Sequence, residues 1–406
     1  MPSAGVHLVV KLSVVPRIRK GASAFRGSTR SYSGNPSPGP GEEGGAVGPF
    51  RPRLRASLKA RARSIVLLSI VLDLPLLSRA ARTLTREPRI ELLEIDGVPV
   101  EIVRPSGEKP HSAFLFVNGA HPLRRKEPVV QRLSRGLARA GFLAVVPDLP
   151  GLGEGEVTTR PLDALLPVTE YAVDRPDVRG GRVALVGAST GASLALLAAA
   201  RPELADKISV VAAVVPFANL DKMVCLATTG FYEEDGGFVP YEVADLSRRI
   251  VARSLVAALD CDDREELLAE LTRMEIDGVD PLEELPLRQG LSPKAQKVAR
   301  LLANRDPAGF RTLCAEAPPE ITALMSRLSP LAAAPSIVVP VEVAVPPDDM
   351  YFPLAEAAAL AGALPNVRLT VTRTLDHTRP SLSLNTLRDF RRFDRFVVRT
   401  LALAGS

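Results

Sequence analysis

The sequence predicts an α/β fold: a mostly parallel, doubly wound sheet that carries a helical cap insertion. Three observations support this prediction. Short apolar runs typical of buried strands alternate with helical runs from about residue 89. The alternation stops after Pro216 and resumes at Ser336, and the residues between are rich in helix formers. The turn sequence GASTG, residues 187–191, stands where an apolar strand gives way to an Ala-rich helix.

Charge divides the chain into a basic N-terminal part and an acidic remainder. Residues 1–63 contain 12 Lys and Arg against two Glu, a net charge of +10, whereas residues 64–406 have a net charge of −5. The basic residues lie among Ser, Gly and Pro with few aromatic residues, a composition typical of disorder rather than of a nucleic-acid interface. We therefore expect residues 1–63 to form a basic, disordered extension, of which residues 1 to about 50 are dispensable, and we expect no nucleic-acid partner.

Residues 64–88 start with an apolar run from Ser64 to Leu77 behind a basic cluster. The run is shorter than a bilayer span, and Asp73 and Pro75 interrupt it. Two interpretations are open: a helix docked on the folded body, or a segment, residues 51–77, that attaches to an anionic membrane surface. The sequence therefore leaves the compartment open, with a cytoplasmic or a membrane-associated location favoured.

The folded body is expected to begin with a hairpin of two antiparallel strands, RIELLEI and VPVEIV, around Asp96-Gly97. Further strands are expected in SAFLFV, FLAVVP, RVALVG, ISVVAAVVP, SIVVPVEVAV and VRLTVTRTL, with helices between them and an amphipathic helix at the end. These elements place the body at residues 89–216 and 336–406. Residues 217–335 contain no strand candidate of comparable strength, so we expect them to form an all-helical lid over one edge of the sheet.

Ser189 is the candidate nucleophile. Ligands of an open parallel sheet bind beyond the carboxyl ends of the strands, and Ser189 follows the strand RVALVG. Gly187 would allow a strained bend and Gly191 a close approach of helix and strand, while the N-terminus of the following helix would favour an oxyanion. The pattern alone also fits an ordinary tight turn; its place between strand and helix favours the nucleophile.

A serine nucleophile needs a base, and the chain has only four histidines. His7 lies in the tail, His111 precedes a strand and His121 lies upstream of the serine, so His377, after the last strand, is the predicted base. The orienting acid is expected in the loop PPDDMYFP.

That loop offers two adjacent carboxylates. Asp349 is preferred because it lies closer to the next helix, and Asp348 is the alternative. Asp376 is a poor candidate, because a neighbour of His377 in an extended chain points away from it.

Backbone donors for an oxyanion are expected on both sides of the serine. The loop after SAFLFV reads Asn118-Gly119-Ala120-His121-Pro122, and the N–H of Ala120 could act together with that of Thr190. Taken alone, this loop is also consistent with an ordinary turn between a strand and a helix.

The cysteines exclude two other kinds of site. Cys225, Cys261 and Cys314 are odd in number and lack the C-x-x-C spacing, so neither a disulfide framework nor a zinc site is indicated. We expect them to be small buried residues and expect no metal.

With these residues in place, the chain resembles the α/β-hydrolase superfamily over about residues 89–404. The matching motifs, in order, are NGAHP, DLPGLGEGE, GASTG, PPDDMYFP and LDHTRP. The resemblance implies a Ser-acid-His triad, no cofactor and a lid inserted after the sixth strand. Two features qualify it: Asn118-Gly119 replaces the common His-Gly of the oxyanion loop, and the lid is long. Residues 148–151, DLPG, are expected to be structural.

A serine nucleophile in this fold favours acyl transfer. We expect a carboxylic-ester hydrolase that works through an acyl-enzyme, with a peptidase, thioesterase or acyltransferase as alternatives of the same fold and a non-catalytic binding protein as the alternative from another class. The expected partner is a small ester or other acyl compound. The apolar lid helices suggest an apolar group, although the same residues could simply pack the lid onto the body.

Overall fold

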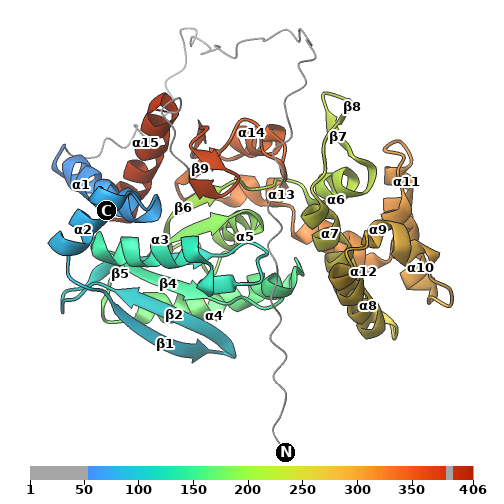
Figure 1. The fold of residues 1–406 in the computed structure, drawn as a ribbon, viewed down its shortest axis with the longest axis horizontal. Helices are drawn as coiled ribbons and strands as arrows, with labels where there is room; N and C mark the ends of the chain where they lie inside the picture. The colour runs from blue at the N-terminus through green and yellow to red at the C-terminus, as the bar shows by residue number, and fades with distance from the viewer. Residues whose placement is uncertain (1–53, 381–386, 406) are drawn as a thin grey trace, which may run out of the picture. The chain divides into compact units, whose positions relative to one another are not determined.

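The computed structural model describes residues 54–380 and 387–405. Eight strands form one sheet in the order β1-β2-β4-β3-β5-β6-β9-β10 (Figure 1). Strands β1 and β2 form an antiparallel hairpin, β2 runs antiparallel to β4, and all other neighbours are parallel. The bounds are β1 Arg89–Ile95, β2 Val98–Arg104, β3 His111–Val117, β4 Leu143–Pro147, β5 Val178–Ala188, β6 Ile208–Val214, β9 Val341–Val345 and β10 Val367–Val371.

Helices cover both faces of this sheet because successive strand side chains point to opposite sides. Leu115 and Leu185 face one layer, whereas their neighbours Phe114 and Ala184 face the other. The first layer contains α4 (Arg160–Asp174), α5 (Thr190–Ala199) and α14 (Leu354–Ala363), and the second contains α1 (Leu54–Val71), α3 (Pro128–Arg139) and α15 (Leu387–Ala404). The predicted doubly wound, mostly parallel sheet is confirmed.

The N-terminal helices correct one predicted boundary. Residues 54–63, predicted to belong to a disordered extension, lie in α1, and α2 (Pro75–Leu84) follows after Asp73 and Pro75 end the first helix. Arg63 stacks on the Phe142 ring at 4.3 Å, and Ser64 Oγ donates a hydrogen bond to Asp394 of α15 at 2.7 Å. Helix α1 is thus docked on the body. Residues 1–53 lie outside the described residues, so the disorder predicted there stays a prediction.

A search of the helices within residues 54–380 and 387–405 finds none that is long and apolar enough to cross a membrane.

The segment between β6 and β9 contains a hairpin as well as helices. Strands β7 (Phe231–Glu234) and β8 (Gly237–Pro240) pair around a tight turn, so the prediction of an all-helical insertion is wrong for residues 231–240. Asp235 and Gly236 both have positive φ, which a tight hairpin turn requires. We call residues 217–335 the cap segment. Its helices are α6 (Leu220–Thr229), α7 (Asp245–Ala257), α8 (Arg264–Asp277), α9 (Pro281–Glu284), α10 (Pro293–Ala303), α11 (Phe310–Glu316), α12 (Pro319–Arg327) and α13 (Pro330–Ala333) (Figure 1).

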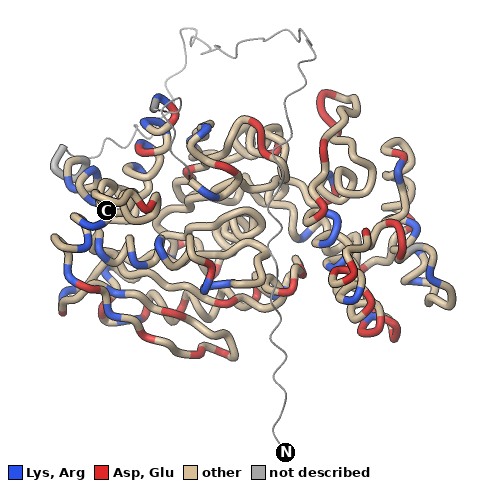
Figure 2. The backbone as a smooth tube through the Cα atoms, viewed as in Figure 1, with Lys and Arg blue, Asp and Glu red and all other residues tan. Residues whose placement is uncertain are grey.

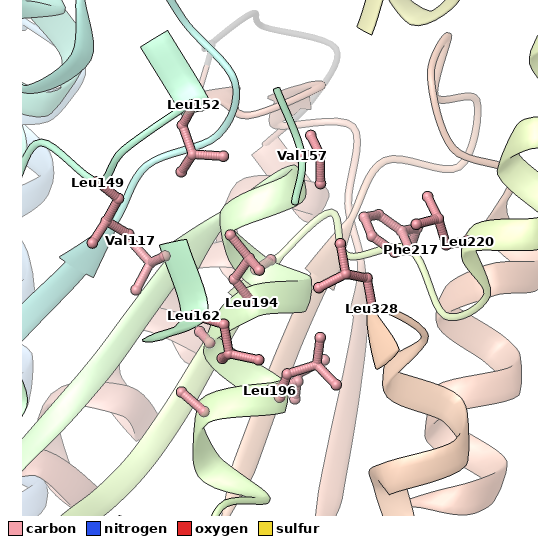
Figure 3. Close-up of a cluster of buried hydrophobic side chains, with 14 of the residues drawn as sticks. Val117, Leu149, Leu152, Val157, Leu162, Leu194, Leu196, Phe217, Leu220 and Leu328 are labelled. Atoms are coloured by element: carbon pink, nitrogen blue, oxygen red, sulfur yellow. The ribbon is translucent and has the colours of Figure 1, made fainter. Parts of the chain in front are cut away.

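The apolar residues of the cap segment are packed into the core. Leu255, Val298 and Ile321, from the three apolar helices that suggested an apolar substrate, are at most 1% exposed and belong to the same cluster as the sheet residues. Figure 3 shows how Phe217, Leu220 and Leu328 from the two ends of the segment gather with Leu194 of α5 and Val157. These side chains therefore hold the cap segment on the body.

Candidate active site

Ser189 lies at a sharp turn between β5 and α5. Its φ of 55° and ψ of −130° are outside the regions that a non-glycine residue usually adopts. The turn is fixed on both sides: the Ser189 N–H donates to Val214 O at 2.9 Å, and its carbonyl accepts from Ala192 N at 2.8 Å. A strained residue held between a buried strand and a buried helix is typical of a functional position.

The glycines beside Ser189 are required by close packing. A Cβ on Gly187 would lie 2.3 Å from Gly191 O, and one on Gly191 would lie 2.2 Å from Val117 O. Gly187 does not have positive φ, so the predicted reason for this residue is wrong: the strained conformation belongs to Ser189 itself. Both glycines let the turn fold back against itself and against the end of β3.

The loop after β3 lies directly against the serine. A Cβ on Gly119 would be 3.2 Å from Ser189 Cβ. The Ala120 N–H donates a hydrogen bond to Thr190 Oγ1 at 2.9 Å, so this predicted donor is engaged with a side chain of the turn. Asn118 is 6% exposed, and its Nδ2 has no partner among the described residues. The structure therefore brings together the residues predicted on the two sides of an oxyanion.

His377 and Asp349 form a hydrogen-bonded pair. His377 lies at the tip of a two-residue turn between β11 (Leu375–Asp376) and β12 (Arg379–Pro380), with a φ of 50°. Its Nδ1 is 2.8 Å from Asp349 Oδ2, and the Asp349 side chain is only 2% exposed.

The backbone fixes the other carboxylate oxygen of Asp349. Its Oδ1 accepts from the N–H groups of Tyr351 and Phe352, both at 2.8 Å. Asp348 and Asp376 are exposed, so of the three candidate acids the structure brings only Asp349 to the imidazole.

Ser189 and His377 are not joined directly. The structure records no hydrogen bond between Ser189 Oγ and the imidazole within residues 54–380 and 387–405. They approach the same edge of the sheet, because Ser189 follows β5 and Asp349 follows β9, with only β6 between these strands. Catalytic hydrogen bonds are often long or poorly aligned before substrate binds, so the missing hydrogen bond does not exclude His377 as the base for Ser189.

Aromatic side chains surround the imidazole, and the sequence analysis did not identify them. The rings of Tyr351 and Phe352 lie 4.4 Å and 5.9 Å from that of His377, and Phe352 makes an edge contact with Phe217 at 5.6 Å. Tyr241, from the cap segment, donates its hydroxyl hydrogen to Asp349 O. Burial, followed by the nearby Asp349 charge, raises the pKa of Tyr241 to about 12, so this phenol stays a proton donor. Tyr351 and Phe352 belong to the PPDDMYFP motif and could have been found there; Tyr241 carried no local signal.

A buried carboxylate connects the cap segment to the acid loop, residues 346–353. Glu356 of α14 is 1% exposed and accepts from the Ala218 and Asn219 N–H groups at 2.6 Å and 2.8 Å. Its other oxygen accepts from the Tyr232 hydroxyl at 2.5 Å. Because Ala218 and Tyr232 belong to the cap segment and Glu356 follows the acid loop, this network fixes their relative position.

The turn at Ser189 joins β5 of the mostly parallel sheet to α5, and Asp349 and His377 follow Ser189 in the chain order Ser, Asp, His. The described residues have the α/β-hydrolase fold. The resemblance drawn from the sequence is therefore confirmed at the level of the fold.

The chain was also compared with known proteins. No protein-family model matches the sequence, and no curated protein sequence matches it. Among solved structures, the chain is similar to 2,6-dihydroxy-pseudo-oxynicotine hydrolase, with 16% identity, a TM-score of 0.47 and coverage of 85% of this chain and 80% of the other. It is also similar to proline iminopeptidase from Mycobacterium smegmatis, with 16% identity, a TM-score of 0.42 and coverage of 78% of this chain and 99% of the other. A further similar structure is Est1E from Butyrivibrio proteoclasticus, with 14% identity, a TM-score of 0.43 and coverage of 77% of this chain and 99% of the other.

The remaining residues singled out in the sequence lie outside the centre of this candidate site. Asp148 accepts from the Arg125 N–H at 2.9 Å and pairs with the Arg125 guanidinium, which fits the structural role expected for residues 148–151. His121 accepts from the Leu123 N–H at 3.3 Å, and burial lowers its pKa. His7 lies outside the described residues.

The cysteines do not form a metal site. Cys225, Cys261 and Cys314 are free; Cys225 is buried and the other two are half-buried. In the described part of the chain, no group of three or more His, Cys, Asp or Glu side chains is arranged to hold a metal ion.

Proposed function

We propose that this α/β-hydrolase-fold protein is a serine hydrolase that cleaves a carboxylic ester of a small molecule. The observation that carries the proposal is the His377–Asp349 pair, 2.8 Å apart, at the same sheet edge as the strained Ser189. A buried carboxylate on Nδ1 fixes the tautomer that leaves Nε2 free to accept a proton. A merely structural histidine would not need this pairing next to a serine held in an unfavourable conformation.

In the proposed reaction, Ser189 Oγ attacks the substrate carbonyl carbon while its proton passes to His377 Nε2. The carbonyl electron pair moves to oxygen, and N–H groups at the start of α5 stabilise that anion. Collapse breaks the carbonyl–alkoxy bond, His377 returns the proton to the leaving alcohol, and an acyl-Ser189 remains. Water then attacks the acyl-enzyme by the same steps, which releases the acid. Asp349, hydrogen-bonded to Nδ1, stabilises the imidazolium.

The acyl compound itself is the least defined part of the proposal. The same nucleophile and base would also serve a peptidase, a thioesterase or an acyltransferase. The apolar cap helices no longer favour an apolar substrate, since the side chains that suggested one pack into the core. An ester is preferred to an amide because its alkoxide leaves more readily than an amide nitrogen.

The decisive experiment is labelling by a fluorophosphonate probe together with hydrolysis of p-nitrophenyl esters of increasing chain length. We expect the protein to react at Ser189 and to hydrolyse the short esters, and we expect Ser189→Ala to lose both properties while its circular dichroism spectrum is unchanged. A wild-type protein that neither reacts with the probe nor cleaves any acyl substrate would instead be a non-catalytic binding protein. Full activity in Ser189→Ala would refute the assignment of the nucleophile.

We also propose that the N-terminal helices attach the protein to an anionic membrane surface, as the basic and apolar composition of residues 51–77 suggested. Helix α2 leaves Leu76 and Leu84 82% and 86% exposed, beside the exposed Arg79 and Arg82. Figure 2 marks Lys and Arg positions along the backbone of α1 and α2. Exposed leucines interleaved with arginines match a surface that offers both acyl chains and phosphate groups.

A further inference from the structure

The Thr190 hydroxyl is placed between the two sides of the candidate oxyanion site. Thr190 is the first residue of α5 and directly follows Ser189. Its Oγ1 accepts the Ala120 N–H at 2.9 Å, and the residue is 6% exposed. The N–H that the sequence analysis assigned to the oxyanion is therefore bound to a neighbouring side chain.

A hydroxyl that accepts a hydrogen bond still has a proton to donate. No acceptor for the Thr190 hydroxyl proton occurs among the described residues, although the side chain is nearly buried. Buried polar groups are normally paired, so a free proton beside the nucleophile is open to a bound group. The N–H of Thr190 is at the first position of a helix, where it has no partner within that helix.

The loop after β3 is packed closely against the turn at Ser189. A Cβ on Gly119 would already lie 2.9 Å from Ala188 O and 3.6 Å from Thr190 Oγ1. Direct donation from Ala120 to a substrate oxygen would require the Thr190 side chain to rotate away and lose its hydrogen bond. Donation by the Thr190 hydroxyl requires no such rotation and keeps the hydrogen bond from the Ala120 N–H.

We propose that the Thr190 hydroxyl is a catalytic donor to the substrate oxyanion and that the Ala120 N–H acts through it. In this arrangement Ala120 N–H points to Thr190 Oγ1, and the Thr190 hydroxyl proton points to the carbonyl oxygen that becomes negative when Ser189 attacks. The Ala120 hydrogen bond polarises the hydroxyl and strengthens its donation, since consecutive hydrogen bonds reinforce each other. The Thr190 N–H supplies the second donor. The inference rests on the proposed acyl-transfer function.

The test compares Thr190→Val, which keeps the shape but removes the hydroxyl, with Thr190→Ser, which keeps the hydroxyl. For hydrolysis of a short p-nitrophenyl ester we expect Thr190→Val to lower kcat by about 10²- to 10³-fold with little change in KM. Thr190→Ser should stay within about tenfold of the wild type. A trifluoromethyl ketone, which forms a tetrahedral adduct with a serine, should lose affinity for Thr190→Val and keep it for Thr190→Ser.

The outcomes separate this inference from the proposed function. A kcat in Thr190→Val equal to or above the wild-type value would mean that the hydroxyl does not donate to the oxyanion, and equal losses in Val and Ser would indicate a structural role; either result overturns the inference. Thr190→Ala provides a second hydroxyl-free variant if Thr190→Val does not fold. Fluorophosphonate labelling of Ser189 in the wild type tests the proposed function separately, and absence of labelling there counts against that function and this inference together.

Discussion

Asp349 holds His377 through a hydrogen bond of 2.8 Å, while its second oxygen accepts two backbone N–H groups from the residues that follow it. The carboxylate is thus fixed by the chain before it orients the ring. Asp348, its neighbour in sequence, is exposed and makes no comparable contact in the described residues. This difference between adjacent, chemically identical residues gives a direct test of the pair.

Asp349→Asn should lower kcat for ester hydrolysis by about 10⁴-fold, because an amide at this position favours the wrong tautomer of the imidazole. The matched control is Asp348→Asn, for which we expect activity within about twofold of the wild type, since surface substitutions away from a site have small effects. Steady-state kinetics on both variants makes the comparison. Equal losses would argue against Asp349 as the specific partner of His377.

Gly191→Ala should prevent correct folding or lower the free energy of unfolding by more than about 4 kcal/mol, because the new Cβ would overlap two backbone oxygens at 2.2 Å and 2.3 Å. Gly362→Ala is the control: it lies in α14 with nothing within 4 Å, and replacing a helical glycine should stabilise by about 0.5 to 1 kcal/mol. Urea denaturation measures both. A stable Gly191→Ala variant would show that the turn can open.

Tyr232→Phe removes one of the three donors to the buried Glu356 carboxylate. We expect a loss of about 1.5 to 3 kcal/mol in the free energy of unfolding, the range for hydrogen bonds to charged groups. The control Tyr171→Phe, at a tyrosine that is 38% exposed, should change stability by less than about 0.5 kcal/mol. Denaturation curves of the two variants decide whether Tyr232 anchors the hairpin of the cap segment.

The cysteine thiols should react slowly in the folded protein. Burial raises the pKa of Cys314 to about 12 and raises the pKa values of Cys225 and Cys261 above their usual range. Since only the thiolate is nucleophilic, the thiolate fraction of Cys314 at pH 8 should be about a thousandfold below that of a free cysteine, and reactivity should increase as pH rises. Alkylation by iodoacetamide, followed by mass spectrometry in native buffer and in urea, tests this. Rapid native labelling of Cys314 would contradict it.

Membrane attachment should depend on the exposed leucines of α2. We expect the protein to sediment with vesicles of phosphatidylcholine and phosphatidylglycerol, but not with phosphatidylcholine alone, and to be released by salt. The combined variant Leu76→Ser/Leu77→Ser/Leu84→Ser should lose this binding. The variant Ile276→Ser/Leu287→Ser, which replaces equally exposed residues of the cap segment, should keep it. Equal sedimentation of the two variants would mean that α2 is not the attachment site.

The sheet could be predicted from the sequence because its strands are buried on both sides. Runs such as AFLFV and VALVG contain no polar side chain, and the structure confirms strands there. The expected strand at SIVVPVEVAV was too long: it starts only at Val341, after Pro340, and Val338 is 67% exposed. A proline cannot donate to the ladder of hydrogen bonds, so the pairing begins after it.

The residues of the candidate site also divide into those that the sequence predicted and those that it did not. Chain order and local patterns pointed to the serine, the histidine and the acid loop, since each directly follows a strong strand. Tyr241 and Glu356 could not be found, because their partners lie 108 and 138 residues away in the chain. The β7–β8 hairpin was missed because all four residues of β8 are exposed and lack the burial pattern of a strand.

Helix α1 has a practical consequence for anyone who shortens this protein. It covers Phe142 and meets α15 near the opposite end of the chain, so it supplies part of the interior even though the sequence places it next to a basic tail. Expression from Arg89 onward would leave Phe396 and Leu137 facing water and should yield aggregates. Truncated proteins that begin at or before residue 54 keep helix α1 and its contacts with the core.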